Sequence, residues 1–317
     1  MAYNIFKQKI KIQINTIMFR PIHSFNKLSQ RTQGYLLVLF TMCVWGSFSL
    51  LSRVTVAWQI SPWDVIAMRF AFSALILLPI IHHQKDWQFL WSRRSIILAL
   101  MGGVGYSCLV YTAFALAPVV HGAVFLNGVI PLATALLLWV FFRVKPDRNT
   151  KIALSIIIMT LLAMTTIIMA GAYHFNVGDA IFVACAFCWA GFSVLLREWQ
   201  LTPWQAMCST VFWSAIIYLP IYALFIGFSS PNASIIHLGI QGIFHSVLVM
   251  IVATVTYAMA VARLGAFQAG GLSSLAPFMS ALLAVPLLGE PLSMVMALGL
   301  IGMGLGTVQP WRWLNRS

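Results

Sequence analysis

Residues 111–137 read YTAFALAPVVHGAVFLNGVIPLATALL, and residues 257–283 read YAMAVARLGAFQAGGLSSLAPFMSALL. An offset of 146 places Tyr257 on Tyr111 and Pro277 on Pro131, and it aligns the Ala-Leu-Leu that closes both stretches. Matched alanines and leucines mean little in an apolar chain. A tyrosine and a proline at one unbroken offset indicate a duplication, and duplicated halves are typical of secondary transporters.

A second set of matches precedes the first in each half. Ser61-Pro62-Trp63 returns as Thr202-Pro203-Trp204 at an offset of 141. An offset of 144 aligns five more residues of each half: Trp45, Phe48, Ser49, Leu51 and Arg53 with Trp189, Phe192, Ser193, Leu195 and Arg197. The offset changes only where a loop changes length, as it does between two copies of one unit.

The composition is that of a polytopic membrane protein. The chain has 317 residues, of which 61% are hydrophobic and 8% charged, and its mean hydropathy is +0.92. Soluble domains carry about 25% charged residues. The net charge of +13 does not indicate a nucleic-acid partner, because the basic residues lie beside hydrophobic spans. All five cysteines lie within apolar segments, so we expect neither a disulfide framework nor a redox role for Cys185 and Cys188.

Ten apolar segments are each long enough to cross about 30 Å of hydrocarbon as a helix. Pro, Gly, Asn or charged residues mark the short loops between them. The predicted spans are 33–53, 62–81, 95–116, 119–142, 151–171, 178–197, 204–227, 236–259, 264–288 and 292–310.

Lysine and arginine predict the orientation. With the amino terminus inside, 17 of the 19 basic residues fall in the tail or in inner regions, and only Arg53 and Arg69 do not. Both termini are therefore predicted to be cytoplasmic. Because each half has five spans, the second half enters the membrane from the opposite face, and the halves form an inverted repeat. The predicted units are a basic cytoplasmic tail (1–32) and two five-helix repeats (33–172 and 173–311).

The ordered set of short motifs over residues 33–310 resembles the EamA-type carriers of the drug/metabolite transporter superfamily. The motifs are Trp45-Gly46-Ser47-Phe48, Met68-Arg69-Phe70, Ala123 to Pro131, Leu272 to Pro277, and Leu288-Gly289-Glu290-Pro291-Leu292. The family often has a Gly-Glu pair after the fourth span as well, where this chain has Phe142-Arg143-Val144-Lys145, so Glu290 has no twin in the first half. The resemblance implies a carrier of a small metabolite or drug in the bacterial cytoplasmic (inner) membrane.

Five polar residues are predicted to meet near the midplane, where inverted-repeat carriers bind substrate. A rise of 1.5 Å per residue places Arg69, Asn127 and His245 roughly 10, 12 and 14 Å below the outer face, and Ser273 and Ser274 reach similar depths from the inner face. Each polar group in hydrocarbon costs a few kcal/mol. A cavity with Arg69 in its wall suits an anionic or zwitterionic small molecule.

Each of these residues also has a plainer interpretation. Arg69 could snorkel outward or lock helix ends, and Asn127, Ser273 and Ser274 could serve only helix packing. His245 is the candidate for proton coupling because imidazole titrates near neutral pH, but a buried neutral histidine fits equally well.

Four further sites complete the candidate set. Trp45 and Trp189 occupy equivalent positions in the two halves, where they wall the cavity or simply pack. Glu290 is a candidate gate that could pair with Arg53, or a solvated loop residue. His121, near the outer end of the fourth span, is expected at the membrane interface. Residues 302–306 form a Gly-x-x-x-Gly pair that permits close helix contact within a monomer or across a homodimer.

The function predicted from the residues is secondary transport, as an exporter or exchanger, by alternating access. No metalloprotease or serine-hydrolase motif is present, and no aspartate pair lies inside a span, so we expect no catalytic residue, cofactor or metal site. An intramembrane enzyme and a channel or structural membrane protein remain the alternatives.

Overall fold

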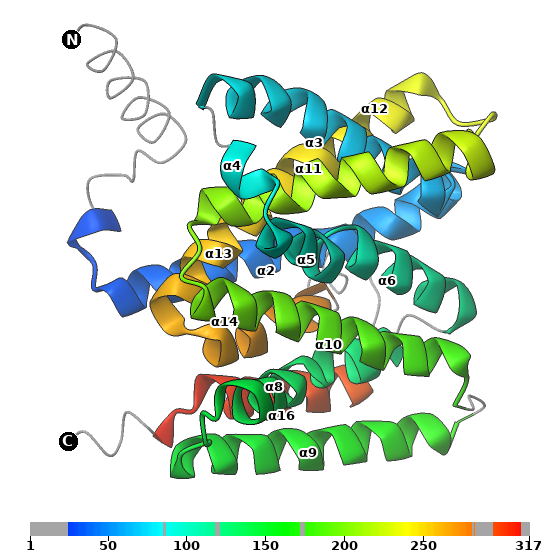
Figure 1. Ribbon diagram of the computed structural model, residues 1–317. Helices are drawn as coiled ribbons and strands as arrows, with labels where there is room; N and C mark the ends of the chain where they lie inside the picture. Colours follow the sequence, from blue (N-terminus) through cyan, green and yellow to red (C-terminus); the bar gives the residue numbers. More distant parts are fainter. Residues whose placement is uncertain are drawn as a thin grey trace, which may run out of the picture.

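The computed structural model describes residues 25–84, 87–117, 121–171, 175–280, 282 and 294–311, and these residues form helices and connecting turns (Figure 1). The first half contains α2 (Gln30–Ala57), α3 (Pro62–Gln84), α4 (Trp87–Leu90), α5 (Arg93–Gly102), α6 (Val104–Leu116), η2 (Gly122–Gly128), α8 (Ile130–Phe142) and α9 (Arg148–Met169), preceded by a turn, Phe25–Lys27. The second half contains α10 (Val177–Glu198), α11 (Pro203–Ile221), η3 (Tyr222–Ile226), α12 (Ile235–Ile243), η4 (Phe244–Val252), α13 (Ala253–Leu264), α14 (Ala266–Ser273) and α16 (Met294–Val308).

Several of these helices are long and apolar enough to cross a membrane. By length and composition the described residues contain seven such helices, and Met294–Val308 is a shorter apolar helix. Their bounds lie within a few residues of the predicted spans. Several predicted spans are built from more than one piece: α5 and α6 meet at a bend, and η2 with α8, α11 with η3, and α12 with η4 and α13 run on from one another.

The bend between α5 and α6 lies at Gly103. A Cβ atom at this position would lie 2.2 Å from Oγ of Ser214 in α11. The same hydroxyl oxygen accepts the N–H of Val104, at 2.8 Å. Only a residue without a side chain therefore permits this approach of α11 to the third span.

Pairs of helices pack reciprocally between the halves. Helix α2 packs on α13 and α10 packs on α6, so the first span of each half contacts the third span of the other. In the same way α11 packs on α5 while α3 packs on α12 and η4, and α10 packs on α8 while α2 packs on α14. Helices α3 and α11, and likewise α9 and α16, contact each other. This is the pattern that a pseudo-twofold axis between two copies produces.

The two copies run in opposite directions. In Figure 1, α2 begins at the left side of the bundle, whereas α10 begins at the right side and ends at the left. The left side also carries the start of α9 and the end of α16. We call this side the basic face, since Arg31, Arg148, Arg197 and Arg263 lie at the helix ends there, and we call the other the opposite face.

The Gly-x-x-x-Gly pair lies against α9. A Cβ atom at Gly302 would lie 2.0 Å from Oγ1 of Thr160, and one at Gly306 would lie 2.5 Å from Cγ1 of Ile157. These glycines therefore permit a close contact between α16 and α9 within the chain, as the packing interpretation predicts.

Candidate functional site

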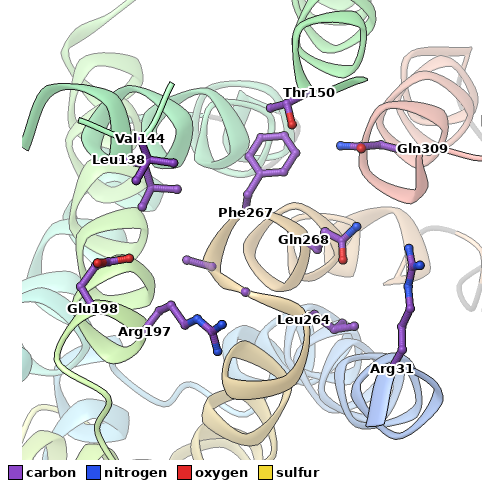
Figure 2. A pocket seen from close by; sticks show the side chains of 12 residues that line it. Arg31, Leu138, Val144, Thr150, Arg197, Glu198, Leu264, Phe267, Gln268 and Gln309 are labelled. Carbon is purple, nitrogen blue, oxygen red and sulfur yellow. The ribbon is translucent and has the colours of Figure 1, made fainter. Parts of the chain in front are cut away.

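A cavity of about 410 Å³ opens between the helix ends of the basic face (Figure 2). Its wall is built by the first turns of α2, α9 and α14 and by the last turns of α8, α10, α13 and α16 or the residues that follow them. Beside leucine, valine and Phe267, it carries six polar or charged side chains: Arg31, Thr150, Arg197, Glu198, Gln268 and Gln309.

The charges of this cavity lie on two sides of Phe267. Figure 2 shows Arg31 and Gln309 on one side, and Arg197 and Glu198 on the other. Arg197 is held in place, since its Nη1 donates to the carbonyl oxygen of Ala262 at 2.7 Å. A bound molecule would thus meet cationic, anionic and amide groups in one space.

Gln309 is the most unusual residue of the wall. Its side chain has 0% exposure, and neither amide atom has a hydrogen-bond partner among the described residues. Its φ of 54° lies in the left-handed region, directly after α16 ends at Val308. Burying an unpaired amide costs about 1–3 kcal/mol. Water or a polar molecule in the cavity would offset that cost.

At the opposite face, a buried aspartate connects the second span to the end of the seventh span and the loop after it. Asp64, in the first turn of α3, is 1% exposed. Its carboxylate accepts hydrogen bonds from the hydroxyl of Tyr222 at 2.5 Å, from the N–H of Ser229 at 3.1 and 3.2 Å, and from the hydroxyl of Ser230. The Ser230 oxygen accepts in turn from the N–H of Ser61, at 2.7 Å. This cluster ties the second span to the loop after the seventh.

A second buried contact on the opposite face joins η2 to α10. Nδ1 of His121 and Oδ1 of Asp179 lie 2.7 Å apart, and both side chains have 0% exposure. Oδ2 of Asp179 also accepts the N–H of Asn176, at 2.9 Å, which caps α10. His121 was expected at the membrane interface; its side chain is buried against a partner 58 residues away in the sequence, and its depth in the membrane stays a prediction.

Trp45 and Trp189 meet in the centre of the bundle. Their ring centroids lie 5.0 Å apart at an interplanar angle of 84°. Tyr257 contacts both rings, at 5.3 and 5.2 Å, and its hydroxyl lies 2.5 Å from Oγ of Ser193. Tyr257 itself has 0% exposure. Both tryptophans thus belong to an aromatic cluster that lies between the first, sixth and eighth spans.

Arg69 and His245 form the second part of the predicted site. Nε of Arg69 donates to Sδ of Met250 at 3.3 Å, and the described residues offer it no carboxylate partner. His245 is 1% exposed, its Nε2 lies 3.1 Å from Oε1 of Gln241, and it is close enough to Arg69 for their charges to interact. A cation with no carboxylate partner among the described residues favours an anionic binding partner.

The three remaining polar candidates bond to their own helices. Nδ2 of Asn127 donates to the carbonyl of Gly122 at 3.1 Å, and the hydroxyls of Ser273 and Ser274 donate to carbonyls three residues earlier. Asn127 and His245 nevertheless share one feature, since each lies in a π-helical segment, η2 or η4. Such segments are rare and are frequently found at functional sites.

None of the seven predicted binding residues lines the cavity at the basic face. Their role in binding therefore stays a prediction. Glu290 and the side chain of Arg53 lie outside the described part of the chain, so the predicted gate does as well. Among the residues that the structure describes, no group of three His, Cys, Asp or Glu side chains could hold a metal ion.

The polar residues of the cavity were missed because they lie at helix ends. There a charged or amide residue looks like ordinary surface, as Arg197 and Glu198 do. One signal was available: five of the helices predicted to end on the same face carry these polar residues in or beside a terminal turn. The sequence does not show that these ends surround one space.

One solved structure, titled "Crystal structure of protein", matches over 90% of this chain and 99% of its own length. The TM-score is 0.67 at 19% sequence identity, a likeness that shows the fold alone. No curated protein matches the chain.

The EamA-like transporter family matches twice, at residues 32–166 and at 176–309. The two matches coincide with the two halves seen in the sequence and in the reciprocal packing, and they cover most of the chain. The resemblance noted from the motifs is thereby confirmed. The chain belongs to the EamA-like transporter family.

Proposed function

We propose that this protein is a secondary transporter that moves a small anionic or zwitterionic molecule across the bacterial inner membrane by alternating access. The observation that carries the proposal is the contrast between the two faces. The basic face opens into a cavity of about 410 Å³, whereas the side chains of Asp64, His121 and Asp179 are buried in contacts at the opposite face.

In this proposal the chain has ten spans in two inverted repeats, with both termini in the cytoplasm. The helix directions and the reciprocal packing support the inversion. The basic helix ends support a cytoplasmic location of the open face, because loops rich in lysine and arginine stay inside. The structure then represents the state of the carrier that is open to the cytoplasm.

The charges of the site support the substrate class. Arg31 and Arg197 in the cavity, and Arg69 deeper in the bundle, favour an anionic group, while Glu198 offers a partner for a cationic one. A solute would pass from the cavity toward Arg69 and His245. The central cluster of Trp45, Trp189 and Tyr257 lies where it would have to rearrange for passage.

Solute counterflow tests this proposal. Purified protein would be reconstituted in liposomes loaded with an unlabelled metabolite extract and then given a trace of a radiolabelled mixture of organic acids and amino acids. A carrier gives saturable uptake that the internal extract stimulates. Uptake without that stimulation indicates a channel, chemical conversion of a solute indicates an enzyme, and no protein-dependent change refutes transport of these classes.

A further inference from the structure

The residues that form the closed contact at the opposite face occupy positions in the repeat that are equivalent to residues at the open cavity of the basic face. The offset of 146 for the fourth and ninth spans places Phe267 opposite His121, and the offset of 144 for the first and sixth spans places Tyr35 opposite Asp179. Phe267 lines the cavity. The hydroxyl of Tyr35 accepts from Nη2 of Arg31, which also lines it, at 3.3 Å.

The two positions are therefore equivalent in the sequence but not in the structure. At the opposite face, His121 and Asp179 meet at 2.7 Å with 0% exposure. At the basic face, the equivalent helix starts, of α14 and α2, stand beside a cavity. Inverted repeats provide alternating access because one half can adopt the arrangement of the other.

We propose that the His121–Asp179 pair is the gate of the outer pathway: it breaks when the carrier opens outward, and a cavity then forms between η2 and α10. This inference rests on the proposed function. It assigns a role to two residues that the sequence had left aside, and it defines where solute meets the protein from outside.

Chemistry favours this pair as a gate. A histidine–aspartate hydrogen bond buried from water is strong, and loss of one side chain takes from the other a hydrogen bond that only water could replace. Water can satisfy those groups only if the space between η2 and α10 opens. At the other end of the protein the equivalent residues, Phe267 and Tyr35, have no such pair to form, so the closed basic face requires other contacts.

Two cysteine reporters test the gate, in a chain whose five native cysteines have been replaced by alanine. Ala123→Cys lies two residues beyond His121 at 2% exposure, and Gln268→Cys lies in the wall of the cavity. Each would be labelled with a charged methanethiosulfonate reagent, Ala123→Cys from outside in whole cells and Gln268→Cys from the cytoplasmic side in inverted vesicles.

His121→Phe, which installs the residue found at the equivalent position, and His121→Gln, which keeps a polar side chain, should both shift the protein toward the outward-open state. Loss of a charge-assisted hydrogen bond changes a two-state equilibrium by roughly tenfold or more. We expect labelling of Ala123→Cys to rise about tenfold while labelling of Gln268→Cys falls, and Asp179→Asn to act in the same direction. Asp147→Asn, an exposed aspartate that caps α9 on the basic face, is the matched control and should change neither reporter.

The opposite change of the two reporters is the decisive feature. If both reporters become more reactive, or neither changes in any of the three variants, the pair serves only the stability of the fold and the gate is refuted. The counterflow assay on the unsubstituted protein tests the proposed function independently of the gate. Positive counterflow with unresponsive reporters overturns the gate alone, and absent counterflow removes the basis of both.

Discussion

Replacing Asp64 by asparagine should loosen the opposite face. The Asp64 carboxylate accepts hydrogen bonds from the hydroxyl of Tyr222, the N–H of Ser229 and the hydroxyl of Ser230. Both of its oxygens therefore accept at least one hydrogen bond. An asparagine amide must turn its NH₂ group toward one of these donors in either orientation. At least one hydrogen bond is therefore lost, and the others lose the assistance of the negative charge.

The size of the effect follows from that count. A hydrogen bond to a charged group contributes about 1.5–3 kcal/mol and a neutral one about 0.5–1.5 kcal/mol. Three bonds to the charged carboxylate contribute about 4.5–9 kcal/mol and two neutral bonds about 1–3 kcal/mol, so the unfolding free energy falls by about 3.5–6 kcal/mol. A change of 1 kcal/mol shifts the melting temperature of a chain of 150–250 residues by about 2–4 °C, and a longer chain by less, so we expect a fall of roughly 5 °C.

Tryptophan fluorescence during heating of the purified protein measures this shift. Asp64→Ala, which leaves all three donors without an acceptor, should melt lower than Asp64→Asn. The matched control is Asp147→Asn, because asparagine caps an exposed helix start about as well as aspartate does, so this variant should melt close to the unsubstituted protein. If Asp64→Asn melts with the unsubstituted protein, or no lower than Asp147→Asn, the buried carboxylate does not hold the two helices together as the structure indicates.

Three other substitutions or fusions test separate parts of the account. Arg69→Ala should abolish uptake at near-normal abundance and Arg69→Lys should keep part of it, because lysine retains the charge without the planar fork; full transport by the alanine variant would exclude a binding role. Gly302→Ala should cost about 1–3 kcal/mol because its Cβ would lie 2.0 Å from a side chain of α9, whereas Gly304→Ala meets open space, and equal melting of the two would contradict the packing. Reporter fusions after Trp311 and within residues 172–178 should give opposite results, and an outside-only signal at the carboxyl terminus would overturn the ten-span topology.

The fold was largely predictable because its signals are periodic and local. Apolar length predicts helices, and the predicted starts at 151 and 204 lie within three residues of where α9 and α11 begin. The repeat offsets predicted two equivalent halves, and the EamA-like family matches both halves. The bend at Gly103 was not predicted, because it depends on the approach of Ser214 from a helix more than a hundred residues away.

The site was less predictable, since burial and partners depend on contacts that the sequence does not show. Depth along a helix singled out Arg69 and His245, of which His245 is buried and Arg69 half-buried, yet the cavity formed elsewhere, among helix ends. His121 looked like an interface residue because it lies near the start of a span, and Asp64 was not singled out from the sequence. Only the fold brings Ser229 and Asp179 to them.

The central claim is that this chain alternates between states open to one face at a time. Spin labels at Arg31 and Val144, which both line the cavity, would report the width of its mouth by pulsed electron resonance in lipid. The account predicts two distance populations, a wide one as in this structure and a narrow one that grows in the His121→Phe variant. A single wide population, unchanged in that variant and in the presence of transported solute, would contradict alternating access.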